Sequence, residues 1–158
     1  MTSRNPFSHL DESGRAHMVD VSDKPVTRRA AEASCRVTLS AETVKKLGDL
    51  PKGDAIAVAR LAGVQGAKRT AELIPLAHPL GLEQVEVSVV PSDDGVEIRS
   101  QVIVNARTGA EMEALVACST AALALYDMVK AVERRATITD LRLEYKSGGR
   151  SGEFRRQG

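Results

Sequence analysis

The residues from Arg107 to Arg135, RTGAEMEALVACSTAALALYDMVKAVERR, constrain the fold more than any other part of this sequence. Arg107-Thr108-Gly109 is typical of a turn, and the good helix formers that follow contain no Pro or Gly, which predicts one long helix. Apolar side chains fall on nearly every side of it: Met112, Leu115, Val116, Ala117, Cys118, Ala121, Ala122, Leu123, Leu125, Met128, Val129 and Val132. Such a helix must be covered on more than one flank, by a sheet and, in an oligomer, by another subunit.

Four polar residues spaced seven apart, Glu113, Thr120, Asp127 and Arg134, form one stripe on this helix, with Lys130 beside its lower end. One interpretation is a solvated edge with an ordinary Asp127–Lys130 ion pair, worth about 0.2–0.5 kcal/mol. The other is a carboxylate and an ammonium held against a buried cleft, where they act as tuned acid and base. Spacing alone favours the first interpretation, because structural ion pairs outnumber catalytic ones.

Composition limits the classes of function. The chain has 158 residues, the size of one domain, and its 22 Lys and Arg nearly balance its 21 Asp and Glu. That balance argues against attraction to nucleic acids or membranes, and two Tyr, two Phe and no Trp are too few for a base-stacking surface. Cys35 and Cys118 lack motif spacing, which predicts buried, reduced thiols in a soluble cytoplasmic protein. We expect neither a signal peptide nor a run of membrane-spanning length.

The pattern of apolar residues predicts the secondary structure. Alternating segments indicate strands at residues 17–21, 29–39, 83–90, 96–105 and 137–145, with a turn at 91–95. Shorter helices are expected at 41–47, after Ser40 as N-cap, and from Asp54 to about residue 73. Gly63 and Gly66 within the second of these indicate close contact with another backbone.

The main elements follow one another as β-α-β-β-α-β. This order is typical of a ferredoxin-like α+β sandwich, in which both helices cover one face of an antiparallel sheet. We expect residues 1–16 to form a mobile arm, residues 17–146 a single α+β domain and residues 147–158 a Gly-rich tail.

Basic residues stand close to glycines at several points of the chain. Lys52 lies in a turn, Lys68 follows a helical glycine, and Lys146 and Arg150 flank Gly148-Gly149. Glycine-rich backbone with such neighbours forms anion-binding concavities, so one hypothesis is a phosphorylated ligand. The other is a solvated, flexible tail, and the spacing of a P-loop is absent.

The three histidines, His9, His17 and His78, lack the spacing of metal ligands, so no metal site is predicted. His78 lies between two prolines. It is either an acid–base group or an anchor for its own loop.

Seven motifs stand in a fixed order along the chain. They are HMVDVS (17–22), KGD (52–54), GAKRT (66–70), LIPLAHPL (73–80), GAEMEAL (109–115), YDMVKAV (126–132) and KSGG (146–149). Together they resemble the cyclic pyranopterin monophosphate synthases, the molybdenum cofactor biosynthesis protein C family, over nearly the whole chain. The family often has Cys where Ala77 stands and Lys where Arg150 stands. The first difference argues against a thiol at that position, and the second removes proton transfer, because Arg stays protonated.

The resemblance implies a lyase of molybdenum cofactor (molybdopterin) biosynthesis. Such enzymes convert a cyclised dihydroguanosine triphosphate into cyclic pyranopterin monophosphate and release diphosphate. The residues implied in lysine/aspartate acid–base catalysis are Asp127, Lys130 and Lys52. Those implied in substrate binding are Leu76, Ala77, His78, Glu111, Met112, Glu113, Arg29, Lys68 and Lys146, with Arg150 as a lesser contributor. The implied assembly is a homohexamer, a trimer of dimers, with the site between subunits; whether Mg²⁺ accompanies the triphosphate stays open.

The residue types suit that chemistry. Building a pyranopterin requires proton shuttling, and clustered lysines lower one another's pKa so that an ammonium can serve as acid and, deprotonated, as base. The remaining cations would neutralise phosphate charge as it develops. Two other hypotheses are a module that binds a phosphorylated metabolite without chemistry and an RNA-binding domain on a similar fold.

The length of the helix also bears on assembly. In an unbroken helix Glu113 and Asp127 lie about 21 Å apart, too far for one chain to grip a nucleotide tightly at both ends. Either residues 111–113 precede the helix and fold back, or two chains contribute to each pocket. We favour the second.

Overall fold

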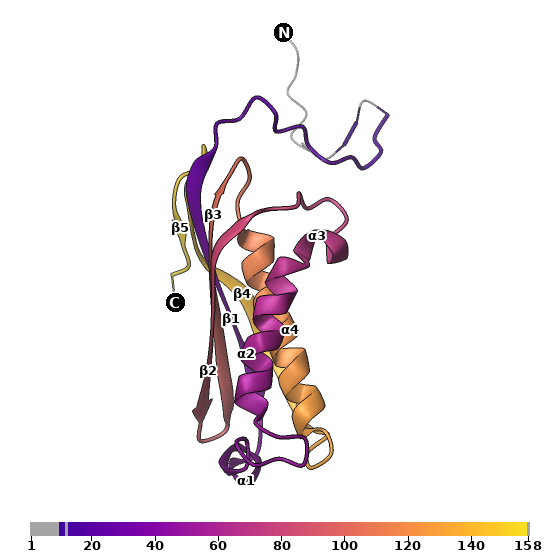
Figure 1. Ribbon diagram of the computed structural model, residues 1–158, viewed down its shortest axis with the longest axis vertical. Coiled ribbons are helices and arrows are strands. Elements are labelled where there is room, and N and C mark those ends of the chain that lie inside the picture. Colours follow the sequence, from indigo (N-terminus) through magenta and orange to yellow (C-terminus); the bar gives the residue numbers. More distant parts are fainter. Residues whose placement is uncertain (1–9, 12, 158) are drawn as a thin grey trace.

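The computed structural model describes residues 10, 11 and 13–157 and confirms the ferredoxin-like α+β fold (Figure 1). One five-stranded sheet has the order β2-β3-β1-β4-β5, and every pair of neighbours is antiparallel. Its strands are β1 (Thr27–Thr38), β2 (Leu82–Ser92), β3 (Gly95–Ala106), β4 (Thr137–Ser147) and β5 (Phe154–Arg155).

Two helices lie side by side on one face of this sheet (Figure 1). They are α2 (Ala55–Lys68) and α4 (Glu111–Val129), accompanied by the short helices α1 (Ala41–Lys45) and α3 (Thr70–Leu73). Ser40 caps α1 as predicted, because its hydroxyl accepts a hydrogen bond from the Thr43 N–H.

The core lies between the sheet and α4. The helix-facing side of β1 consists of small residues that are almost fully buried, Ala31, Ala33, Cys35 and Val37. They let α4 approach the sheet closely, and most of the apolar residues of α4 are buried as well. The prediction of buried, free thiols is confirmed for Cys35 and Cys118.

The predicted strand at residues 17–21 is wrong. An alternating segment becomes a strand only where a neighbouring strand can satisfy its backbone groups, and within the described residues the sheet begins at Thr27. The Val19 carbonyl instead accepts a hydrogen bond from His78 Nε2 at 2.9 Å. Most of the arm predicted at 1–16 lies outside the described residues.

Several predicted boundaries moved for local reasons. The helix expected up to residue 73 breaks at Arg69, where the Thr70 hydroxyl donates to the Ala67 carbonyl oxygen at 3.0 Å. The long helix ends at Val129, whose carbonyl accepts from the N–H groups of Val132 and Glu133, so Arg134 does not continue the polar stripe.

Three other differences concern the ends of elements. Helix α1 stops two residues before its predicted end, at Lys45, and the hairpin turn narrows to two residues because β2 and β3 extend further. The tail after residue 147 contains the unpredicted β5, which pairs with β4 through Tyr145 and Lys146.

Helix α4 also corrects the expectation about membrane-spanning length. It is long and apolar enough to cross a membrane, but the core helix of a soluble protein satisfies the same criteria. Most of this helix is buried inside the fold, which favours the second explanation.

The two glycines of α2 mark a close approach to α4, as predicted. A Cβ atom on Gly63 would lie 3.0 Å from the Ala117 carbonyl oxygen, and one on Gly66 would lie 2.7 Å from the Cβ atom of Thr120. The second separation is shorter than Cβ contacts in real proteins, so α2 can occupy its place only without a side chain there.

We therefore expect Gly66→Ala to destabilise the protein by about 1–3 kcal/mol, because the added methyl group overpacks the helix interface. Thermal unfolding of the two proteins measures this as a lower melting temperature. Gly48→Ala is the matched control, since a Cβ atom at Gly48 meets nothing within 4 Å. Equal melting temperatures for Gly66→Ala and the unmodified chain would contradict the packing argument.

Candidate active site

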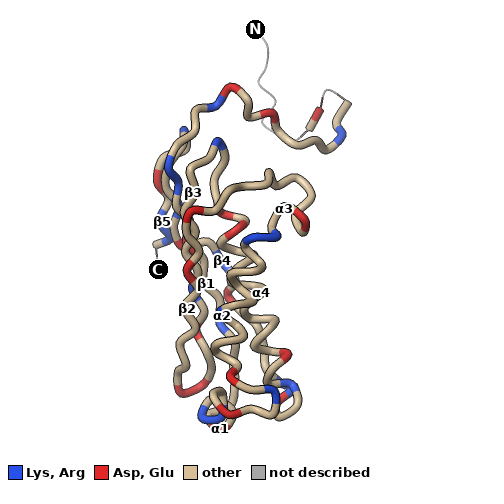
Figure 2. The backbone as a smooth tube through the Cα atoms, viewed as in Figure 1, with Lys and Arg blue, Asp and Glu red and all other residues tan. Residues whose placement is uncertain are grey.

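Asp127 joins two lysines at the C-terminal end of α4. Its Oδ2 atom lies 2.8 Å from Lys52 Nζ, and its Oδ1 atom lies 2.6 Å from Lys130 Nζ. Lys52 Nζ also donates to the Asp127 main-chain carbonyl oxygen at 3.1 Å. Figure 2 shows acidic and basic residues side by side at this end of the helix pair, next to α1.

A tight turn delivers Lys52 to α4 from 75 positions away in the sequence. Gly53 has a φ of 102°, which favours glycine, and its N–H donates to the Leu50 carbonyl oxygen. Asp54 then starts α2 by accepting from the N–H groups of Ile56 and Ala57 at 2.9 and 3.1 Å. The KGD motif therefore presents a lysine, reverses the chain and caps a helix.

The two lysines keep Asp127 ionised. Hydrogen bonds from Lys130 and then from Lys52 lower the pKa of this carboxyl group to about 2. All three side chains remain about half exposed in the single chain, with 54% exposure for Asp127, so the ion pairs are screened by solvent and contribute little to stability.

A second group of predicted residues surrounds a cavity of about 290 Å³ at the other end of α4. Glu111, Met112 and Glu113 come from the first turn of the helix, and Leu76, Ala77 and His78 come from the loop after α3. Val19 and Val21 also line it, and the hydrogen bond from His78 holds Val19 there.

Glu113 is an unusual member of this cavity, because its side chain is ionisable and the residue is only 4% exposed. Burial raises its pKa to about 7, and the nearby charge of Glu111 adds to the effect. A carboxyl group of this kind changes its protonation state near neutral pH.

A larger cavity of about 500 Å³ adjoins the first and shares Lys24, Thr108, Gly109 and Glu111 with it. The cations in its lining are Lys24, Arg29, Arg107, Lys146 and Arg150.

Arg29 is held in this cavity by the backbone of the strand end and the Gly-rich tail. It donates to the carbonyl oxygens of Ala106 and Arg107 at 3.1 and 3.0 Å. Gly149 has a φ of 73°, and a Cβ atom there would lie 2.8 Å from the guanidinium carbon of Arg29. The glycine is therefore required for the close approach of chain and cation.

The structure places most of the implied site residues in two groups, one around Asp127 and the other around the two adjoining cavities. Lys68 is different: it lies exposed at the end of α2 and lines neither cavity. Lys24 and Arg107 line the larger cavity but were not predicted. Their signal was weak, since only the neighbouring Pro25 and the turn at Arg107-Thr108-Gly109 marked them.

The two groups occupy opposite ends of one unbroken helix. Glu111 is the first residue of α4, so residues 111–113 do not fold back before the helix. The fold-back arrangement considered from the sequence is therefore wrong.

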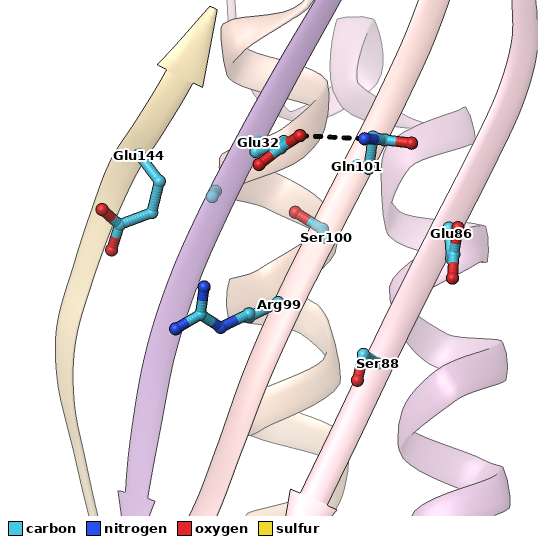
Figure 3. Close-up of a pocket in the computed structure, with 8 residues that line it drawn as sticks. Glu32, Glu86, Ser88, Arg99, Ser100, Gln101 and Glu144 are labelled. Atoms are coloured by element: carbon cyan, nitrogen blue, oxygen red, sulfur yellow. Dashed lines mark hydrogen bonds between the residues drawn. The ribbon is translucent and has the colours of Figure 1, made fainter. Parts of the chain in front are cut away.

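The sheet face opposite the helices carries another hollow, of about 200 Å³ (Figure 3). Two of its carboxylates have partners: Gln101 donates to Glu32 at 2.9 Å, and Arg142 lies 2.8 Å from Glu144. None of the residues implied in catalysis or binding lines it. These satisfied groups indicate a solvated sheet surface.

Comparison with known proteins identifies relatives over nearly the full length of the chain. The model of the MoaC family matches residues 18–149. A Streptomyces griseus protein named cyclic pyranopterin monophosphate synthase is 55% identical over 158 residues, covering 99% of this chain and 89% of the relative. A Cereibacter sphaeroides protein of the same name is 55% identical over 152 residues, covering 94% and 96%.

Because Glu113 changes its protonation state near neutral pH, we expect its contribution to the free energy of unfolding to depend on pH. Its pKa is about 7 in the folded chain, against an ordinary value of 4.5, so the free energy of unfolding falls as pH rises from about 4.5 to 7. Glu113→Gln removes the cost of burying this carboxylate, so it should raise the melting temperature at pH 8 more than at pH 5. The gain in the free energy of unfolding should differ between the two pH values by up to about 3 kcal/mol. The exposed Glu153 provides the control variant Glu153→Gln. The same shift at both pH values would contradict the prediction.

Proposed function

This chain belongs to the MoaC family, and we propose that it carries out the reaction of its named relatives through Lys52, Asp127 and Lys130. It is an enzyme, a lyase of molybdenum cofactor biosynthesis, which replaces the hypotheses of a non-catalytic module and an RNA-binding domain. The substrate is a cyclised dihydroguanosine triphosphate, and the products are cyclic pyranopterin monophosphate and diphosphate.

The observation that carries the catalytic assignment is the double pairing of Asp127. Holding two long lysine side chains against one half-exposed carboxylate costs side-chain entropy and returns little stability. Stability alone is therefore a weak reason for the arrangement, whereas orientation of two ammonium groups toward one ligand is a sufficient one.

The charges assign different parts to the three residues. With a pKa of about 2, Asp127 stays an anion at neutral pH. Its part is therefore to orient the two lysines, and the lysines transfer the protons. Lys130 then acts as acid and base on the purine-derived part of the substrate, and Lys52 serves the phosphate or ribose end.

The cations of the larger cavity neutralise phosphate charge in this proposal. Arg29, Lys146 and Arg150 surround a space of about 500 Å³, large enough for a nucleotide-sized ligand. Leu76, His78 and Glu113 bind the rest of the substrate in the adjoining cavity.

A complete site then requires two chains. The Asp127 group and the cavities stand at opposite ends of α4, about 21 Å apart along the helix. Large apolar side chains also remain exposed on the helix pair, with 71% exposure for Leu61 and 61% for Leu123. We infer a homohexamer, a trimer of dimers, with each site between subunits, and the two free thiols fit a reducing cytoplasm.

We expect Lys52→Met and Lys130→Met each to lower turnover by at least about 100-fold, because the charge and the exchangeable proton are both lost. Diphosphate release and pterin formation from the cyclised dihydro-GTP intermediate measure this. Lys46→Met is the matched control, since Lys46 forms an exposed pair with Glu42 at 2.6 Å on α1. Full turnover of Lys130→Met with an unchanged melting temperature would refute its assignment.

Mixing two inactive variants tests the shared site. Asp127→Asn disables the group around Asp127, and His78→Ala disables the group around the cavities. A mixed dimer therefore has one site with neither substitution and one site with both. After subunit exchange we expect about a quarter of the unmodified activity, because about half of randomly assorted dimers are mixed. An active monomer in sedimentation, or no recovery despite proven exchange, would exclude a site between chains.

A further inference from the structure

Cys35 and Cys118 form a pair of buried thiols that the proposed reaction does not use. Cys35 lies on the helix-facing side of β1, and Cys118 lies in the middle of α4, with exposures of 3% and 0%. The two positions are 83 residues apart in the sequence. Their meeting is therefore a product of the packing of α4 on the sheet.

Hydrogen bonds place the two cysteines next to each other. Cys35 Sγ donates to the Cys118 carbonyl oxygen at 3.5 Å, and the neighbouring thiol together with burial raises the pKa of Cys35. Cys118 Sγ also contacts the Ser100 hydroxyl at 3.3 Å. It also donates to the carbonyl oxygen of Ile98 at 3.9 Å, and Ile98 is the residue that pairs with Cys35 on β3. The Cys35 sulfur thus lies against the backbone of Cys118, and the Cys118 sulfur lies against the strand residue opposite Cys35.

Small neighbours keep the two backbones close at this point. Ala33 precedes Cys35 on the buried side of β1, and Ala114, Ala117 and Ala121 surround Cys118 on α4. A disulfide requires Cα atoms about 4.4–6.8 Å apart, a separation that large side chains between a helix and a sheet would prevent. Here the interface contains small ones.

We propose that Cys35 and Cys118 are an oxidation site, at which a peroxide converts the two thiols into one disulfide between β1 and α4. The first thiolate attacks a peroxide oxygen, giving a sulfenic acid as the O–O bond breaks. The second thiolate attacks that sulfur; the S–S bond forms and the S–O bond breaks. The balance is two thiols and one hydrogen peroxide giving one disulfide and two waters.

The burial of the two thiols determines which oxidants reach them, and their positions determine what the disulfide does to the fold. Because both residues are buried, an oxidant reaches the sulfurs only when the packing of α4 on β1 opens transiently, and a small peroxide needs less opening than a bulky disulfide reagent. The new bond closes a long loop and fixes α4, which carries candidate site residues at both ends, to the central strand. It restrains the unfolded chain and so stabilises the folded one.

The test treats the full-length protein with hydrogen peroxide and maps its peptides without reduction. We expect one cross-linked peptide pair joining Cys35 to Cys118 and a loss of two hydrogens per chain. The melting temperature should rise by roughly 5–15 °C and return after dithiothreitol. Cys35→Ala and Cys118→Ala should show neither the cross-link nor the reversible rise.

Other products would overturn the proposal. Two thiols that both remain open to alkylation after denaturation, oxidation of either to a sulfinic acid, or cross-links only between chains each contradict it. The map of the unmodified protein decides the question even if an alanine variant fails to fold. None of these readouts depends on turnover. The oxidation site can therefore be refuted while the proposed function stands, and the proposed function can be refuted while the oxidation site stands.

Discussion

The burial of α4 between the sheet and α2 is the constraint on which the rest of this structure depends. A helix that is apolar on nearly every side has to be covered, and here β1 meets it with alanines and α2 meets it with glycines. These small residues place three backbones close together, so the helix is held along its length. Its charged groups are left at the two ends, and both candidate parts of the active site are found there.

The two ends differ in their electrostatics. At one, Asp127 is exposed enough to be solvated and carries two lysines, so it remains charged. At the other, Glu113 is buried and has a pKa of about 7. One helix therefore presents a permanent anion and a carboxyl group that titrates near neutrality. A site assembled from both ends would offer fixed orientation and a proton reservoir together, which suits a reaction that opens and closes rings.

The oxidation site follows from the same close packing. The small side chains that let α4 approach β1 also bring Cys35 against Cys118 and bury both residues among apolar neighbours. The polar face of the sheet is built differently: Gln101 on β3 donates to Glu32 on β1, as in Figure 3, and Arg142 pairs with Glu144 within β4. A residue's chemistry in this fold is therefore set largely by which side of the sheet it faces.

The sequence by itself determined the order of elements, the helix-facing pattern of β1, the caps at Ser40 and Asp54, and the helix contact at Gly63 and Gly66. These features depend on local periodicity and on residue types whose conformational preferences hold in any context. The family motifs also point to Lys52, Asp127 and Lys130 as candidate catalytic residues, and these three side chains meet in the structure. The tertiary structure decided that residues 17–21 form a cavity wall instead of a strand, that Lys24 and Arg107 face the larger cavity, and that Lys68 does not. Such outcomes depend on which distant segments satisfy one another's backbone and charge, and that information is carried by the packed chain as a whole.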